Sequence, residues 1–112
     1  MSEERGRVRY MRLLVFFDLP VETASQRKSY RLFRKHLLKD GFLMIQESVY
    51  AKLVTNDGAA NSVVARLRKN RPPSGLVQVL KVTERQYATM DYITGEQEAK
   101  EEVDTMEEFL VL

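Results

Sequence analysis

A run of apolar residues near the N-terminus, Leu13–Phe17, stops abruptly at Asp18 and is followed closely by Pro20. Five consecutive apolar positions without polar alternation are typical of a strand covered on both faces. Proline lacks the N–H group that a sheet ladder needs, so the strand, which we expect to begin at about Val8 or Tyr10, ends before it. Asp18 is therefore predicted at a strand end. It is either a solvent-exposed catalytic or metal-binding carboxylate or simply a cap of the next helix.

Two stretches have the residue spacing of amphipathic helices. The first begins with capping residues at 22–25 and continues to about residue 40, where Gly41 provides a C-terminal cap. Its apolar stripe consists of Tyr30, Phe33, Leu37 and Leu38. The second helix is predicted over 59–69, and the Pro-Pro-Ser-Gly sequence at 72–75 ends it.

Apolar and β-branched residues fill two further regions. Residues 42–54 form either two strands or one long strand bent near Gln46, and residues 76–82 alternate as a strand does. The resulting order, βαββαβ, is that of the ferredoxin-like sandwich, an α+β fold with both helices on one face of an antiparallel sheet. The other face of such a sheet is bare, so we expect a homodimer in which a second copy covers it.

The two ends of the chain differ from the body. We expect residues 1–9 to be a leader, 10–94 to be the single domain and 95–112 to be an acidic linker with an additional strand at its end. Tyr92–Gly95 resembles a short strand. The last four residues, Phe109–Leu112, are all apolar, and we expect them to pair with an exposed sheet edge of the same chain or of the dimer partner.

Composition narrows the chemistry. The chain has no cysteine and one histidine, His36, which excludes thiolate catalysis and sulfur-based zinc sites. A bound metal would therefore be an oxygen-preferring ion such as Mg²⁺ or Mn²⁺. No apolar run approaches the length of a membrane span, and the charged N-terminus does not resemble a signal peptide, so a cytoplasmic protein is expected.

Positive charge is concentrated in the body of the chain. Residues 1–95 contain 17 Lys and Arg against 9 Asp and Glu, whereas residues 96–112 contain one Lys against 7 acidic residues. The cations at 27, 31 and 35 fall on one line along the first helix. The expected nucleic-acid contacts are Arg27, Arg31, Arg34, Lys35, Arg66, Arg68, Lys69 and Arg71. The alternative is a solvated basic surface without a ligand.

Asp18 alone does not make a nuclease site, because a single carboxylate binds Mg²⁺ weakly. If a two-fold axis brings Asp18 of one chain near its copy, the pair can hold one divalent ion. Alternatively the two carboxylates repel each other or share a proton and do no chemistry. Ser48 and Tyr50 are predicted on one side of a strand, where their hydroxyls contact phosphate or merely decorate the sheet.

Four spaced motifs resemble one known family. They are Phe-Phe-Asp-Leu-Pro at 16–20, the basic helix ending in Gly-Phe at 41–42, Gln-Glu-Ser-Val-Tyr at 46–50 and Val-Thr-Glu-Arg-Gln-Tyr at 82–87. In this order they resemble Cas2, the small CRISPR-associated adaptation protein, over residues 10–94. The chain is most similar to the versions found in type II systems.

The resemblance implies a homodimer whose C-terminal strand pairs with the partner protomer. It also implies that two dimers of the integrase Cas1 flank this dimer, whose basic surface, with Arg27 and Arg31, lies under the duplex DNA of a new spacer. Several members of the family are described as metal-dependent endonucleases on RNA or duplex DNA. In these members the aspartate at the strand end is the metal ligand, and the resemblance implies the same role for Asp18. It also implies that Phe17, Ser48 and Tyr50 lie beside this metal site.

Two departures from the family pattern place the nuclease activity second to the role in spacer acquisition. Nuclease-active relatives often have a tyrosine where this chain has Phe17 and an arginine where it has Met44. We therefore expect first a subunit for CRISPR spacer acquisition that binds duplex DNA and bridges integrase dimers. The alternatives are a Mg²⁺-dependent endonuclease that uses Asp18 from both protomers and a ferredoxin-like mRNA interferase.

Overall fold

The computed structural model describes residues 10–95, which contain four strands and three helices. The elements are β1 (Met11–Asp18), α2 (Ala24–Lys39), β2 (Leu43–Gln46), β3 (Val49–Val54), α3 (Asp57–Lys69), β4 (Leu76–Thr83) and α4 (Glu84–Ala88). The predicted first strand, first helix and last strand are confirmed to within a few residues at each end. The region 42–54 forms two strands joined by a tight turn, which settles the alternative that the sequence left open.

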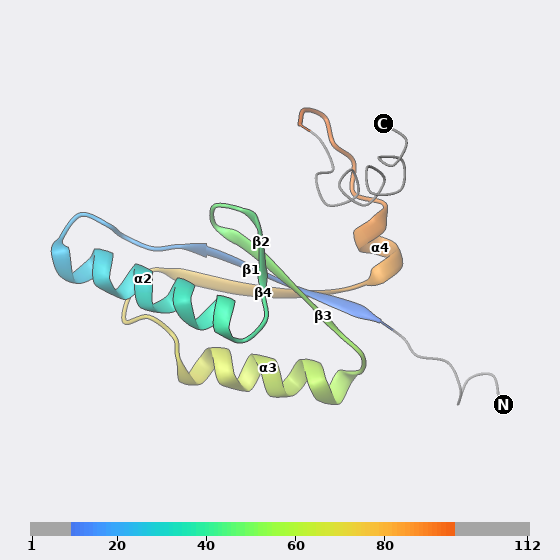
Figure 1. Cartoon of the computed structure of the whole chain (residues 1–112), viewed down its shortest axis with the longest axis horizontal. Helices are drawn as coiled ribbons and strands as arrows, with labels where there is room; N and C mark the ends of the chain where they lie inside the picture. The colour runs from blue at the N-terminus through green and yellow to red at the C-terminus, as the bar shows by residue number, and fades with distance from the viewer. Residues whose placement is uncertain (1–9, 96–112) are drawn as a thin grey trace, which may run out of the picture.

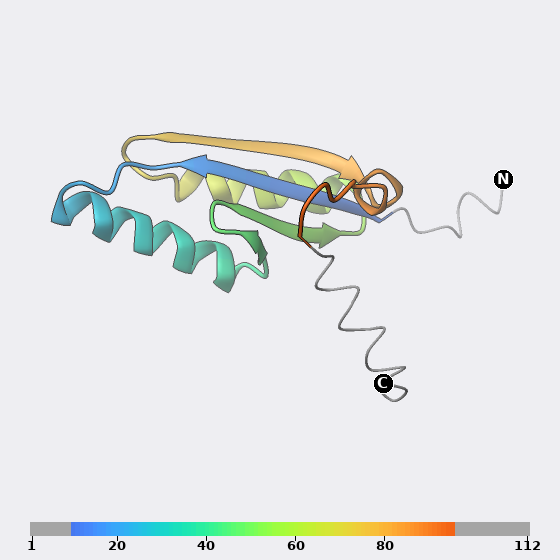
Figure 2. The same cartoon turned by 90° about the horizontal axis from the view of Figure 1, so that it is seen from above.

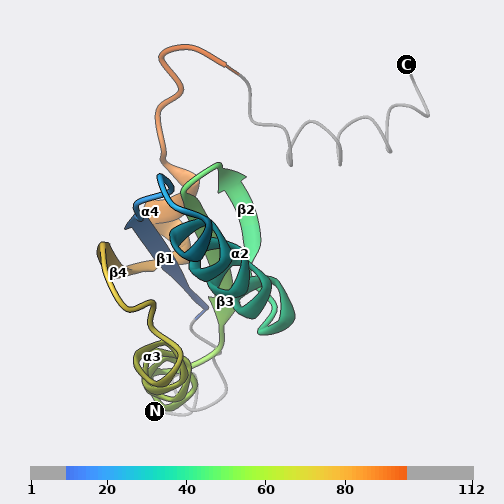
Figure 3. The same ribbon diagram turned by 90° about the vertical axis from the view of Figure 1, so that its left-hand side faces the viewer.

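The strands form an antiparallel sheet in the order β2-β3-β1-β4. Figure 1 shows α2 and α3 along one side of this sheet, and Figure 2, which looks onto the strands, shows α3 behind them. This order with a one-sided helical layer is the predicted ferredoxin-like α+β fold. Helix α4 lies at the end of β4 on the side away from α3 (Figures 1 and 3).

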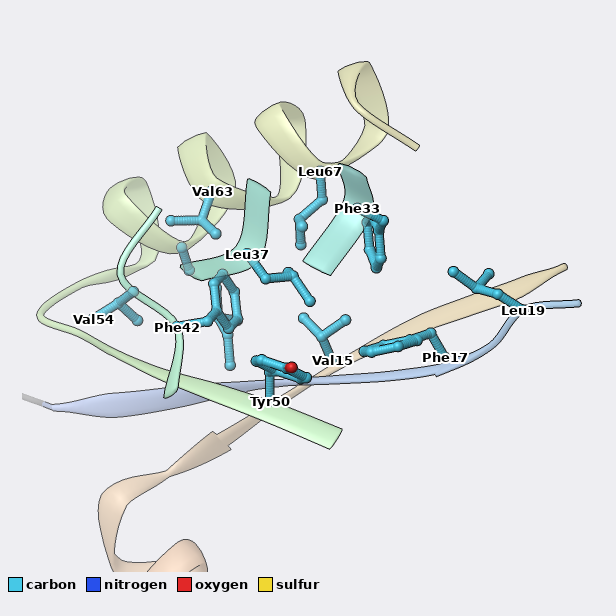
Figure 4. Packing of buried hydrophobic residues seen from close by; sticks show 12 residues of the cluster. Val15, Phe17, Leu19, Phe33, Leu37, Phe42, Tyr50, Val54, Val63 and Leu67 are labelled. Carbon is cyan, nitrogen blue, oxygen red and sulfur yellow. The ribbon is translucent and has the colours of Figure 1, made fainter. Parts of the chain in front are cut away.

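The hydrophobic core lies between the sheet and the two long helices (Figure 4). Alternate residues of the central strands point into it, as the two-residue period of a strand requires. The sheet contributes Leu13, Val15, Phe17, Tyr50 and Val54, and the helices contribute Phe33, Leu37, Ala60, Val63 and Leu67. The predicted stripe of α2 is confirmed for Phe33 and Leu37, whereas Leu38 is 43% exposed.

The opposite face of the sheet is apolar and, apart from α4 at one end, uncovered within the described residues. Leu14 and Ala51 at its centre are buried because their strands are interior to the sheet. Around them Leu43, Leu53, Leu76 and Leu80 are 69, 45, 54 and 51% exposed. We call these six residues the open sheet face. It corresponds to the bare face that the strand order predicts.

Two local predictions are wrong. Helix α3 begins at Asp57, two residues before the predicted Ala59, because the side chain of Asn56 caps it by accepting from the Ala59 N–H at 2.7 Å. Tyr92–Gly95 does not form the expected short strand. The predicted leader and the acidic linker with its C-terminal strand fall on residues 1–9 and 96–112, outside the described residues. Within 10–95, no helix has the length and apolar character that would let it cross a membrane.

Candidate functional site

Asp18 is the last residue of β1, as predicted, and its side chain is exposed. Because Phe17 points into the core, the alternation of the strand places the Asp18 carboxylate on the same side as the open sheet face. On one flank Asp18 pairs with Leu76 of β4, and on the other the Phe17 N–H donates to the Ser48 carbonyl at 3.1 Å. The carboxylate therefore projects from a strand end that is fixed from both sides.

Gly75 packs directly against this strand end. Its φ is +97°, a left-handed conformation that side chains rarely adopt, and a Cβ atom there would lie 2.8 Å from the carbonyl oxygen of Asp18 and 2.7 Å from Cδ2 of Leu19. The close approach of two backbones at the end of β1 therefore requires glycine. The Pro-Pro-Ser-Gly sequence at 72–75 predicted the end of the second helix, but it did not predict this close approach.

Phe17 is a core residue and not part of a metal site within this chain. It is 5% exposed, and its ring makes edge contacts with Tyr30 and Phe33, with ring centroids 5.9 and 5.4 Å apart. Its side chain lies on the helix side of the sheet (Figure 4), whereas the alternation of the strand places that of Asp18 on the other side. Phe17 is therefore next to Asp18 in the sequence, but its side chain points to the other face of the sheet.

Ser48 and Tyr50 do not present hydroxyls side by side. Ser48 lies in the turn between β2 and β3, and its carbonyl supports β1, as described above. Tyr50 is fully buried, and its hydroxyl accepts a hydrogen bond from Nε of Arg34 at 2.8 Å. Met44 pairs with Tyr50 and so lies on the helix side of β2. An arginine at position 44 would therefore not lie beside Asp18 within one chain.

The described residues do not form a metal site by themselves. No group of three or more His, Asp and Glu side chains able to hold an ion occurs within 10–95. Mg²⁺ requires near-octahedral oxygen coordination, and one exposed carboxylate supplies at most a small part of it. A Mg²⁺ or Mn²⁺ site at Asp18 therefore needs donors from outside this part of one chain, such as a second copy.

The predicted nucleic-acid contacts separate into two groups. Those of α2 are exposed, and Arg34 reaches Tyr50 on β3. Arg68 and Arg71 instead line a groove of about 530 Å³ between α3 and β4. Because β1 separates β3 from β4, the two groups lie over different halves of the sheet. The predicted contacts therefore lie in two places on the sheet, and their role in binding nucleic acid stays a prediction.

Arg66 is paired with an acidic residue, Asp40, that the sequence did not indicate as a partner. Its Nη2 and Nε donate to the carboxylate of Asp40, at 3.0 and 3.2 Å, and Lys52 contacts both the carboxylate and the carbonyl of Asp40. Burial raises the pKa of Asp40, but the hydrogen bond from Arg66 and the charges of Lys52 and Arg66 outweigh it, so this pKa lies below its usual value. Arg66 therefore links α3 to the end of α2, and its charge is locally balanced.

A second ion pair joins the start of β1 to α4. The guanidinium of Arg12 donates to both carboxylate oxygens of Glu84, at 2.7 and 3.2 Å, and lies 4.4 Å from the ring centroid of Tyr87. Burial raises the pKa of Tyr87 more than the Arg12 charge lowers it. Thr83 and Gln86 cap α4 reciprocally, so Thr-x-x-Gln was the signal that could have predicted this helix. The contact fixes α4 at the edge of the open sheet face remote from Asp18.

The fold and the site define a small ferredoxin-like protein with an open apolar sheet face and an exposed basic helix. A family model described as CRISPR associated protein Cas2 matches residues 11–90. The chain belongs to this family, which functions in CRISPR adaptation.

Named relatives agree with this assignment. A Treponema denticola protein named CRISPR-associated endoribonuclease Cas2 is 53% identical over 102 residues, which cover 91% of this chain and 100% of that protein. Proteins of the same name from Streptococcus mutans and Ligilactobacillus salivarius are 49 and 43% identical, over 79 and 91% of this chain and 81 and 100% of theirs. The type II assignment stays a prediction, and the mRNA interferase alternative finds no support in these comparisons.

Proposed function

We propose that the protein is a spacer-acquisition subunit that holds duplex DNA against α2 and bridges dimers of the integrase Cas1. The observation that carries this proposal is the exposed basic side of α2, which includes Arg27, Arg31 and Lys35 and is separate from the open sheet face. Lys and Arg side chains on one helix line are suited to phosphate contacts that position a duplex without reading its sequence.

The same proposal includes a homodimer formed through the open sheet face. Its exposed leucines form an apolar surface that a soluble subunit would cover, and a two-fold copy of the same surface is self-complementary. We also propose that the C-terminal strand pairs with an exposed edge of the sheet, for which β2 and β4 are the candidates. In such a dimer both copies of α2 remain accessible to DNA.

Spacer acquisition in cells tests the adaptation role. Replacing Arg27, Arg31 and Lys35 by alanine is expected to abolish acquisition, since three phosphate contacts are lost. Arg85→Ala, which removes an exposed cation of α4, is the matched control and should retain it. Loss of acquisition in Asp18→Asn, with the α2 triple variant fully active, would contradict the proposal.

A second candidate function is a metal-dependent endonuclease, and its support is the position of Asp18. The carboxylate is exposed and fixed at a strand end on the side of the open sheet face, where a two-fold axis can bring it near its copy. A divalent ion bound there would polarise the phosphodiester and activate a water molecule. This chain's own contribution is to hold the carboxylate rigidly, through the β4 pairing and the contact with Gly75. The relatives' name, endoribonuclease, makes RNA the first substrate to test, and duplex DNA is the second.

Cleavage of labelled RNA and duplex DNA, with and without Mg²⁺, tests the second function. Asp18→Asn should abolish metal-dependent cleavage, whereas Asp91→Asn, a change of another exposed carboxylate, should not. Cleavage that persists unchanged in Asp18→Asn would show that Asp18 is not the metal ligand of a nuclease.

A further inference from the structure

The contact between Tyr50 and Arg34 joins the core to the basic helix. Tyr50 is fully buried, and its hydroxyl accepts from Nε of Arg34 at 2.8 Å. Figure 4 shows the ring of Tyr50 packed among apolar side chains of the core, with its hydroxyl oxygen in red. The partner of Arg34 is neutral, so the contact fixes the guanidinium without balancing its charge.

Two other arginines of the described chain are paired with carboxylates. The guanidinium of Arg66 lies on the carboxylate of Asp40, and that of Arg12 lies on the carboxylate of Glu84. Among residues 10–95, Arg34 makes no such ion pair, and no other acceptor takes a hydrogen bond from its Nη1 or Nη2. The guanidinium of Arg34 is therefore anchored through Nε, and its Nη1 and Nη2 can donate to a ligand.

Two adjacent guanidinium nitrogens match the oxygens of a phosphodiester. Arginine binds phosphate through two parallel N–H···O bonds, and less conformational freedom is lost when the planar group is already oriented. Arg27 and Arg31 lie seven and three residues before Arg34, so they project from the same side of α2. The three arginines thus form a row along one exposed side of α2. At the start of this row, Nη1 of Arg27 also donates to the carbonyls of Val21 and Glu22, at 3.1 and 3.0 Å.

We propose that Tyr50 is a positioning residue that orients Arg34 for a bidentate contact with a phosphate of the bound nucleic acid. The inference rests on the proposed function, since it assumes that α2 binds a nucleic-acid backbone. It specifies that the backbone follows Arg27, Arg31 and Arg34, with Lys35 beside this row. It also gives a role to the tyrosine hydroxyl at this fully buried strand position.

Binding of a labelled DNA duplex of mixed sequence by the full chain, measured over a range of salt concentrations, tests this inference. Arg34→Ala should weaken binding about tenfold and reduce the salt slope by about one ion, because one phosphate contact is lost. Tyr50→Phe should weaken binding about three- to tenfold with an unchanged salt slope, since the charge remains but has to be ordered on binding. In the Arg34→Ala background, Tyr50→Phe should have no further effect.

Two further variants separate positioning from folding. Tyr30→Phe removes a hydroxyl from the neighbouring tyrosine of the aromatic cluster and should bind as the wild type does. Arg34→Lys keeps the charge but lacks the planar fork, so it should show the weaker affinity with the wild-type slope even if Tyr50→Phe fails to fold.

The outcomes distinguish the inference from the function on which it rests. Wild-type protein that binds no duplex would overturn both. Binding that depends on Arg27 and Arg31 but is unaffected by Arg34→Lys and by Tyr50→Phe would overturn only the inference. An equal effect of Tyr50→Phe with and without Arg34 would also overturn it, because the tyrosine would then act by another route.

Discussion

Phe17 and Asp18 are adjacent in the chain, but their side chains lie on opposite faces of the sheet. The ring of Phe17 packs against Phe33 and Tyr50, with ring centroids 5.4 and 5.6 Å away, whereas the carboxylate of Asp18 is exposed. The strand end therefore combines a core residue with a candidate functional residue. A substitution at Asp18 should therefore leave the packing of the core intact.

This separation predicts very different effects on stability. Phe17→Ala should lower the free energy of unfolding by about 3–5 kcal/mol, since it removes a large buried ring. Asp18→Asn should change it by less than about 0.5 kcal/mol, because the carboxylate is exposed and makes no ion pair with another described residue. Urea denaturation of both variants measures the difference. Similar losses in the two variants would mean that Asp18 has a structural role.

Gly75 should be intolerant of any side chain. Gly75→Ala combines a left-handed backbone with contacts below 3.0 Å to Asp18 and Leu19, so we expect a loss of stability of about 2–4 kcal/mol. Gly41→Ala is the matched control, because its φ is also near +96° but its nearest neighbour is the flexible end of Lys52, 3.2 Å away. Thermal denaturation should show a clearly smaller loss for Gly41→Ala. Equal losses would show that backbone conformation alone explains the glycine.

Asp40 should contribute to the acid sensitivity of the fold. Its pKa is lower in the folded chain than the ordinary value of about 3.9, so its stabilising effect is present above that pH and is lost as the pH falls through the folded value. Asp40→Asn should therefore destabilise the protein at neutral pH, by about 1–2 kcal/mol, and flatten the loss of stability below about pH 4. Asp91→Asn is the control. Parallel pH profiles for wild type and Asp40→Asn would contradict the ion-pair assignment.

The open sheet face should control the oligomeric state. Leu80→Lys places a charge on this face and is expected to shift the protein from dimer to monomer in sedimentation experiments. Leu32→Lys is the matched control, since Leu32 is 57% exposed on α2, close to the 51% of Leu80. A Leu80→Lys protein that sediments as the wild type does would exclude this face as the dimer interface.

The sequence predicted those features that depend on local spacing. Apolar periodicity located the main elements, and the apolar run followed by proline located Asp18 at a strand end. The sequence could not predict the partners of individual side chains, because these depend on how distant segments of the chain pack together. Arg34 and Arg66 illustrate this: both are cations of predicted basic helices, yet one is anchored by a buried tyrosine and the other is balanced by Asp40. The separation of the basic residues over two halves of the sheet followed from the strand order in space.

Duplex DNA binding by the full chain, measured as affinity and salt dependence, tests directly whether the basic side of α2 holds the duplex. Reversing the charge of the α2 row with Arg27→Glu and Arg31→Glu should abolish measurable binding, because two phosphate contacts become repulsive. Asp18→Asn should bind with unchanged affinity and salt slope, since Asp18 lies on the other face of the sheet. Unchanged binding by the α2 variant, or loss of binding in Asp18→Asn alone, would show that the duplex does not lie along α2.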